Sequence, residues 1–154
     1  MGGKLQVEPF LERLRRAGLR VTASRRAVLE ALAAADRALS LKEIFVQARA
    51  QQPGLGLATV YRTVELLQEL GLIGQVRLRE GCQRYFLVPP GHWHQLVCLG
   101  CGRLIHFPGR DELELLEHSL EEETGYRIEG HSLQFYGYCP EHREEAMDAD
   151  AGSG

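Results

Sequence analysis

The sequence is organised around residues 92–101, which read His92-Trp93-His94-Gln95-Leu96-Val97-Cys98-Leu99-Gly100-Cys101. Cys98 and Cys101 form a C-x2-C turn, and Cys139 with His142 supplies a second pair at C-x2-H spacing. Three thiolates and one imidazole make a tetrahedral ligand set that suits structural zinc. The spacing therefore predicts a structural Zn²⁺ site made of Cys98, Cys101, Cys139 and His142.

The same stretch holds half of a second predicted metal site. His92 and His94 lie two residues apart in an apolar run. Successive side chains of a β-strand leave opposite faces, so both imidazoles would leave the same face. The alternative for any single histidine is a structural, hydrogen-bonded imidazole.

The composition is that of an ordinary soluble protein. With 154 residues, 44% hydrophobic and 25% charged, the chain can bury one core or form two small lobes. No run of eighteen apolar residues and no signal-peptide core are present, so we expect a cytoplasmic protein without a membrane span. Reducing conditions there favour thiolate ligands over disulfides. Cys82 stands apart, and we expect it to be a small, partly buried residue near a turn.

The net charge of -3 conceals a division near Pro89-Pro90. Residues 1–90 carry 14 Lys and Arg against 8 Asp and Glu, a net of +6, and the remainder carries 4 against 13, a net of -9. A basic N-terminal lobe suits a polyanionic partner, which an acidic lobe would repel. Two lobes with different functions are the simplest interpretation.

The N-terminal half predicts a winged helix-turn-helix. Apolar spacing and capping residues predict helices over 8–17, from Thr22 to about 36, from Ser40 to about 51 and from about 58 to 71, with Ser40 and Glu43 forming a capping box. Two β-rich runs, 72–78 and 83–88, then predict a hairpin. In such domains the third or fourth helix enters the major groove of double-stranded DNA. The fourth helix offers residue types that reach base edges and phosphates, namely Thr59, Tyr61 and Arg62, and the alternative is a solvated helix face.

The C-terminal half predicts a small α/β lobe, which makes the overall fold class α+β. We expect a strand through Cys98, a strand over 103–107, a helix over about 111–123 and a strand over 126–138. The last strand carries apolar side chains that a monomer would expose, so we expect a homodimer through this lobe. The predicted domains are a winged-helix domain (1–88), a hinge (89–91), an α/β dimerisation and metal-binding domain (92–142) and a disordered tail (143–154).

Several motifs together resemble the ferric uptake regulator family. They are residues 18–22, residues 56–63, residues 84–87, the His-x-His before Cys98-x2-Cys101, and residues 131–139, in the order that the family has them. The resemblance covers residues from about 10 to 142. It implies a dimeric, metal-dependent bacterial transcriptional repressor that binds a palindromic operator through its winged-helix lobe and holds metals in its α/β lobe.

The resemblance also implies roles for individual residues. Tyr61 and Arg62 match the pair that contacts bases, Arg20 matches a residue that reaches the minor groove, and Arg25 falls at a phosphate contact. His92, His94, Glu114 and His131 match the ligands of a metal site within the dimerisation lobe, with Glu112 as the alternative carboxylate. Such a set suits Zn²⁺ and also accepts Fe²⁺ or Mn²⁺. At the position of His142 the family usually has a fourth Cys.

A second metal site that many family members have at the hinge is expected to be missing in its usual form. The matching positions hold Ala38, Phe86, Trp93, Gln95 and His106, of which only the last is a good ligand. His106, with Cys82 as a remoter candidate, could belong to an altered hinge site. A Cys ligand there would resemble the zinc-responsive branch of the family.

We therefore expect a non-enzymatic repressor of metal-homeostasis genes that responds to zinc, or alternatively to iron or manganese. Two rivals from other classes remain. A zinc hydrolase is one, because His-x-His with a carboxylate and a third His resembles an open catalytic site. The other is a metal buffer or interaction module, which would have no specific affinity for DNA.

Overall fold

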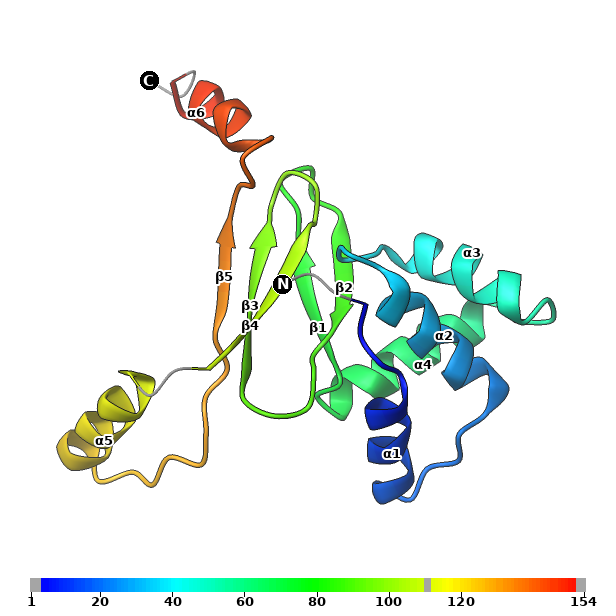
Figure 1. The fold of residues 1–154 in the computed structure, drawn as a ribbon, viewed down its shortest axis with the longest axis horizontal. Coiled ribbons are helices and arrows are strands. Elements are labelled where there is room, and N and C mark those ends of the chain that lie inside the picture. Colours follow the sequence, from blue (N-terminus) through cyan, green and yellow to red (C-terminus); the bar gives the residue numbers. More distant parts are fainter. Residues whose placement is uncertain (1–3, 110–111, 152–154) are drawn as a thin grey trace.

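The N-terminal half forms four helices followed by a two-stranded wing, as the sequence predicts (Figure 1). The computed structural model describes residues 4–109 and 112–151. The elements are α1 (Glu8–Arg16), α2 (Ala23–Ala34), α3 (Leu41–Gln51), α4 (Leu57–Glu69), β1 (Ile73–Arg77) and β2 (Gln83–Leu87). β1 and β2 pair antiparallel, from Ile73 opposite Leu87 to Arg77 opposite Gln83.

The capping residues set the helix starts. The Thr22 hydroxyl accepts a hydrogen bond from the Arg25 N–H (3.2 Å) at the start of α2. Ser40 and Glu43 form the predicted capping box, because the Ser40 hydroxyl accepts from the Glu43 N–H (3.2 Å) and the Glu43 carboxylate accepts from the Ser40 N–H (2.8 Å). These bonds satisfy N–H groups that have no partner within the helix. Both predicted starts are confirmed.

The main hydrophobic core lies within the N-terminal half. Apolar faces of α1 to α4 meet there and close against the start of the wing, as the helical spacing of the apolar residues requires. Its fully buried large side chains are Phe10, Leu11, Leu14, Val28, Leu29, Ile44, Val60, Val64, Leu67, Leu72 and Leu87. The core fixes α4 beside the wing, which places both predicted DNA-contacting elements on one body.

The C-terminal half contains a three-stranded sheet of β3 (Trp93–Cys98), β4 (Leu104–Pro108) and β5 (Gln134–Gly137) in the order β4-β3-β5. β4 runs antiparallel and β5 parallel to β3. Helix α5 (Glu112–Thr124) lies beyond one end of the sheet and α6 (Arg143–Ala151) beyond the other (Figure 1). Together with the N-terminal half, this is the expected α+β fold. No helix in the described ranges combines the length and the apolar character that a membrane span needs.

Two expectations for the C-terminal half are wrong. Residues 126–133 form no strand, and only Gln134–Gly137 pair with β3. β3 begins at Trp93, which lies level with Ser132 in this register, so the residues before Ser132 have no strand beside them to pair with.

The tail is also not disordered where it is described, because residues 143–151 form α6. Neither Gly nor Pro interrupts residues 141–151, and Glu, Ala, Met and Arg favour helix. The prediction of disorder rested on the acidic composition of the tail and did not take this helix preference into account. Residues 152–154 of the predicted tail lie outside the described ranges.

A second, smaller core joins the two halves beside the predicted hinge. It contains Ala38 from the α2–α3 linker, three residues of the wing region and two of the C-terminal sheet, in full Ala38, Val76, Leu78, Phe86, Val97 and Leu104. Backbone bonds across the same joint run from Ala38 N–H to Gly102 O (2.8 Å) and from Leu104 N–H to Asp36 O (3.2 Å). The wing therefore packs against the C-terminal sheet in addition to being linked to it through residues 89–91.

Candidate metal centres and nucleic-acid interface

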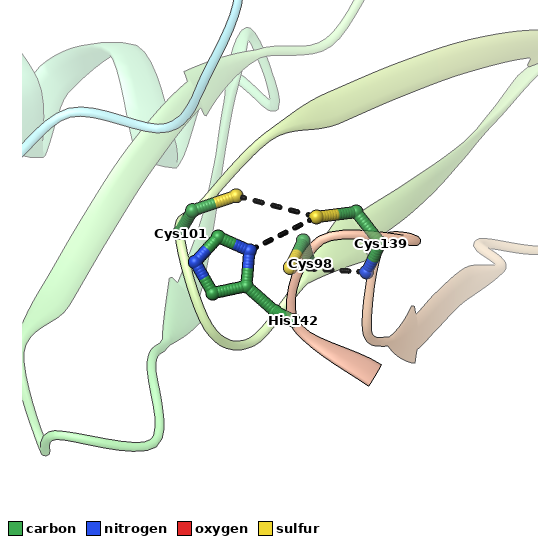
Figure 2. Close-up of side chains that lie close together, drawn as sticks. All are labelled: Cys98, Cys101, Cys139 and His142. Carbon is green, nitrogen blue, oxygen red and sulfur yellow. Dashed lines mark hydrogen bonds between the residues drawn. The ribbon is translucent and has the colours of Figure 1, made fainter. Parts of the chain in front are cut away.

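Three cysteines and His142 converge at one end of the C-terminal sheet (Figure 2). Cys98 ends β3, Cys101 follows in the turn to β4, and Cys139 lies just after β5. The candidate ligand atoms all lie within 4.8 Å of one another. The sulfurs of Cys101 and Cys139 are 3.9 Å apart, and a tetrahedral zinc ion with Zn–S bonds of about 2.3 Å holds two sulfurs about 3.8 Å apart. The donor set and its spacing fit Zn²⁺.

The surroundings of Cys139 favour the thiolate that a metal requires. Burial acts to raise the pKa of the Cys139 thiol, but the Glu141 N–H, the neighbouring thiols and the His142 N–H outweigh it and lower that pKa. The Cys139 sulfur lies 3.0 Å from His142 Nδ1. The Cys98 sulfur accepts a hydrogen bond from the Cys139 N–H at 3.3 Å. A lowered pKa increases the thiolate fraction, which is the metal-binding form.

Gly100 makes room for the imidazole of His142. A β-carbon on Gly100 would lie 2.9 Å from the Cβ and Cγ of His142, closer than real contacts allow. The backbone of Gly100 does not have a positive φ, so the need for glycine here is steric. The C-x2-C turn is thus shaped to accept a histidine as the fourth candidate ligand.

Three imidazoles converge near the opposite end of β3. His92 Nε2 lies 2.8 Å from His131 Nε2, which lies 3.5 Å from His94 Nε2. Zinc–nitrogen bonds of about 2.0–2.1 Å in a tetrahedron hold two nitrogens about 3.3 Å apart, between these two distances. His92 and His94 do share a face, and the structure brings both of them to His131 as expected. The arrangement of nitrogen atoms fits a divalent cation.

His94 is the buried member of this group, with 2% of its surface exposed. Burial, followed by the nearby His92 and His131, lowers the pKa of His94 and favours its neutral form. Neutral imidazole is the form that binds metals. The His94 Nδ1 is buried and has no hydrogen-bond partner among the described residues, while its Nε2 faces His131.

Glu117, and not Glu114, is the carboxylate that reaches the imidazoles. His131 Nδ1 and the Glu117 carboxylate are 2.6 Å apart, which leaves His131 Nε2 facing the other histidines. Glu114 and the alternative Glu112 are exposed, and neither joins the histidine group among the described residues. Glu117 lies on α5 about one turn after Glu114, and the orientation of this helix turns Glu117 toward His131. The bond is of the kind that orients a metal-binding histidine.

Gly109 supports the ring of His92. Its N–H donates to the His92 carbonyl (2.7 Å), and a β-carbon on Gly109 would lie 2.6 Å from three atoms of the His92 ring. Sequence reasoning gave no role to Gly100, Gly109 or Glu117. For Gly100 and Gly109 the available sequence signal was a glycine within the C-x2-C turn and a glycine shortly after the second predicted strand.

The positions of the family's usual hinge site do not form a ligand set. Ala38 and Phe86 belong to the small apolar core, and Gln95 is buried opposite His106 in the sheet. Burial lowers the pKa of His106, and its buried Nδ1 has no partner. Cys82 lies near the wing turn, as expected, but it is exposed, so the prediction of partial burial is wrong. Within residues 4–109 and 112–151, His106 and Cys82 belong to neither group of at least three candidate ligands.

The predicted DNA-contacting residues gather at the start of α4. Arg25, Thr59 and Arg62 line one cleft of about 380 Å³ together with Thr22, Ser24, Thr63 and Leu66. Tyr61 is 51% exposed on the same helix and is not among the residues that line the cleft. The Arg25 guanidinium donates to the carbonyl of Arg20 (2.6 Å), which joins the fifth predicted residue to the group. The start of α4 has no acidic residue and has Arg25 and Arg62 nearby, so it suits the anionic backbone of DNA.

Comparison with known proteins agrees with the fold. The peroxide operon regulator of Bacillus subtilis (strain 168) is 30% identical over 138 residues, which cover 88% of this chain and 92% of the relative. The crystal structure of the Vibrio cholerae ferric uptake regulator matches with a TM-score of 0.61 and 30% identity, covering 84% of this chain and 99% of that one. A zinc-bound manganese uptake regulator matches with a TM-score of 0.56 and 30% identity, covering 88% and 99%. Residues 16–136 match the Ferric uptake regulator family, and the chain belongs to that family.

Proposed function

We propose that the protein is a metal-dependent, DNA-binding transcriptional repressor that acts as a homodimer on a palindromic operator. The observation that carries this proposal is the convergence of three imidazole Nε2 atoms from separate segments, with Glu117 holding the third ring. Its second support is the exposed Arg62 and Tyr61 at the start of α4 on a winged-helix body. The family's relatives include regulators named for peroxide, iron and manganese, so membership alone leaves the sensed metal open.

The histidine group joins helix α5 to the C-terminal sheet, and these two parts otherwise contact each other little. His92 directly precedes β3 and His94 lies at its start, His131 precedes β5, and Glu117 lies on α5. Helix α5 has no buried residue. A divalent cation bound by the three imidazoles would supply positive charge that holds these ligands together. The ligands then fix α5 through Glu117 and His131 against the sheet.

Fixing α5 would shape the surface through which we expect the homodimer to form. Leu115 and Leu116 on α5 are 74% and 55% exposed, and Phe135 and Tyr136 on β5 are 48% and 58% exposed. Exposed apolar surface on a helix and an edge strand favours pairing with a second copy. A dimer with a fixed interface holds its two recognition helices at the spacing of a palindrome, without an ordering cost on binding.

For the bound metals, we infer structural Zn²⁺ at Cys98, Cys101, Cys139 and His142, and regulatory Zn²⁺ at the histidine group. Three imidazoles suit tetrahedral zinc, with Fe²⁺ or Mn²⁺ as the alternative. The hinge positions form no ligand set, which leaves the histidine group as the regulatory site. Zinc is favoured because this remaining group suits tetrahedral binding.

The test combines metal analysis with DNA binding. Duplexes that bind the metal-loaded protein are selected from a randomised pool, and affinity is then measured for stripped protein titrated with Zn²⁺, Mn²⁺ or anaerobic Fe²⁺. The sensed metal should raise DNA affinity, and DNA should raise metal affinity by the same factor. His94→Ala should remove this coupling while the Cys3His zinc stays bound. Occupancy of the histidine group without any change in DNA affinity would exclude the regulatory proposal, and absence of any selected duplex would favour a metal buffer.

A further inference from the structure

The turn that carries two of the candidate zinc ligands is bound to the DNA-binding half. This turn, residues 98–103, is called the cysteine turn below. The Arg79 N–H donates to the Leu99 carbonyl (3.0 Å), and the Ala38 N–H donates to the Gly102 carbonyl (2.8 Å). Arg79 lies in the wing between β1 and β2, and Ala38 lies in the linker between α2 and α3. Two segments of the winged-helix half thus bond to one short turn.

The Arg79 side chain makes a second connection to the same centre. Its guanidinium carbon lies 5.8 Å from the centre of the Tyr138 ring, a cation–π contact. Tyr138 directly precedes Cys139, and Leu99 lies between Cys98 and Cys101. Arg79 therefore contacts both chain segments that supply the cysteine ligands.

Apolar packing makes the wing sensitive to the shape of the turn. Leu78, beside Arg79, is buried in the small core with Val97 and Leu104, which flank the cysteine turn. Gly102 within the turn has a φ of +77°, and a β-carbon there would lie 3.4 Å from the Ala38 carbonyl oxygen and 3.6 Å from Leu78 Cδ1. A change in the turn would displace Leu78 and Ala38 directly.

We propose that the Cys3His centre positions the DNA-binding wing, and that Arg79 is the residue through which it acts. The inference rests on the proposed function, that is, on operator binding and on zinc at the Cys3His centre. With its ligands gathered, the turn presents the Leu99 and Gly102 carbonyls and the Tyr138 ring in fixed positions. The wing is then held at one orientation relative to α4, and DNA binding does not need to order it.

The test uses full-length, metal-loaded protein and a duplex selected from a randomised pool. Tyr138→Leu removes the ring without changing charge, Tyr138→Phe keeps it, and Arg79→Met removes the guanidinium. Arg77→Met is the matched control, because Arg77 is an exposed arginine of the same wing. DNA affinity is measured by fluorescence anisotropy over a range of salt concentrations, alongside zinc content and dimer mass.

We expect Tyr138→Leu and Arg79→Met each to weaken DNA binding by about two- to fivefold, the range of a partly exposed cation–π contact. The double variant should bind DNA with the affinity of the weaker-binding single variant, because both substitutions remove the same contact. Tyr138→Phe should bind like the wild type. Zinc content should stay unchanged, and Arg79→Met should keep the salt dependence of the wild type.

Two results would overturn the proposal. One is wild-type DNA affinity in Tyr138→Leu with its zinc intact. The other is a loss confined to Arg79→Met with a salt slope reduced by about one, which identifies a direct phosphate contact. If Tyr138→Leu loses zinc, Arg79→Met still decides, since it leaves all four ligands in place. Faster hydrogen exchange of the backbone amide at position 79 supports the proposal, and unchanged exchange is a third result that would overturn it. Failure of the wild type to bind any duplex would instead refute the proposed function.

Discussion

Gly109→Ala is expected to damage the histidine site while leaving the Cys3His site intact. A β-carbon on Gly109 would lie 2.6 Å from Cγ, Cδ2 and Cε1 of His92. Three ring atoms at one distance mean that the ring lies flat against the glycine. Gly109 has no positive φ, so alanine introduces no backbone strain and its effect is steric.

The size of the effect follows from this contact. Ordinary van der Waals contact begins at 3.4 Å, so the ring must move by about 0.8 Å, the difference from 2.6 Å. Metal–ligand distances tolerate about 0.2 Å. A shift this large takes His92 Nε2 out of the ligand set, unless the backbone gives way at the Gly109 N–H bond to the His92 carbonyl. We expect metal affinity at the histidine group to fall by at least the 10- to 100-fold that altered supporting residues typically cause.

The assay is competition with a metal chelator, combined with metal analysis. One tightly held zinc per chain should remain in Gly109→Ala, and the second should be lost or weakened. Gly100→Ala should show the reverse, since its β-carbon would meet His142 at 2.9 Å. Gly137→Ala is the neutral control, because a β-carbon there meets nothing within 4 Å. Wild-type metal affinity at both sites in Gly109→Ala would refute the role of His92 as a ligand held against this glycine.

Three further predictions concern single side chains. Arg62→Ala should weaken binding to the selected duplex by about 1–3 kcal/mol and relax sequence preference, as anisotropy on mutated duplexes would show, and a uniform loss on all duplexes would point to a phosphate contact. Glu117→Gln should lower metal affinity at the histidine group about 10- to 100-fold in chelator competition, with Glu114→Gln as the matched control. Burial lowers the pKa of His106 from 6.5, so the unfolded chain binds its proton first and the fold should lose stability as the pH falls below that value. Urea unfolding at pH 7.5 and 5.5 should show a smaller loss for His106→Gln than for the wild type.

Local features of the fold and of the candidate sites could be predicted from the sequence alone. Thr22 and the Ser40–Glu43 pair identify helix starts, because a cap acts over three residues. The C-x2-C and C-x2-H spacings identified a Cys3His set, and strand alternation placed His92 and His94 on one face. All of these depend on interactions within a few residues, or on motifs whose spacing encodes them.

Features that depend on packing between distant segments were decided only by the tertiary structure. The orientation of α5 selected Glu117 over Glu114, and the start of β3 at Trp93 left the residues before Ser132 without a partner strand. The tertiary structure alone also placed Arg79 on the cysteine turn. The physical reason is that local hydrogen bonding fixes an element, whereas its place against other elements depends on side chains far away in the chain. The cysteine turn shows both: its ligands were evident from their spacing, but its contact with the wing was not.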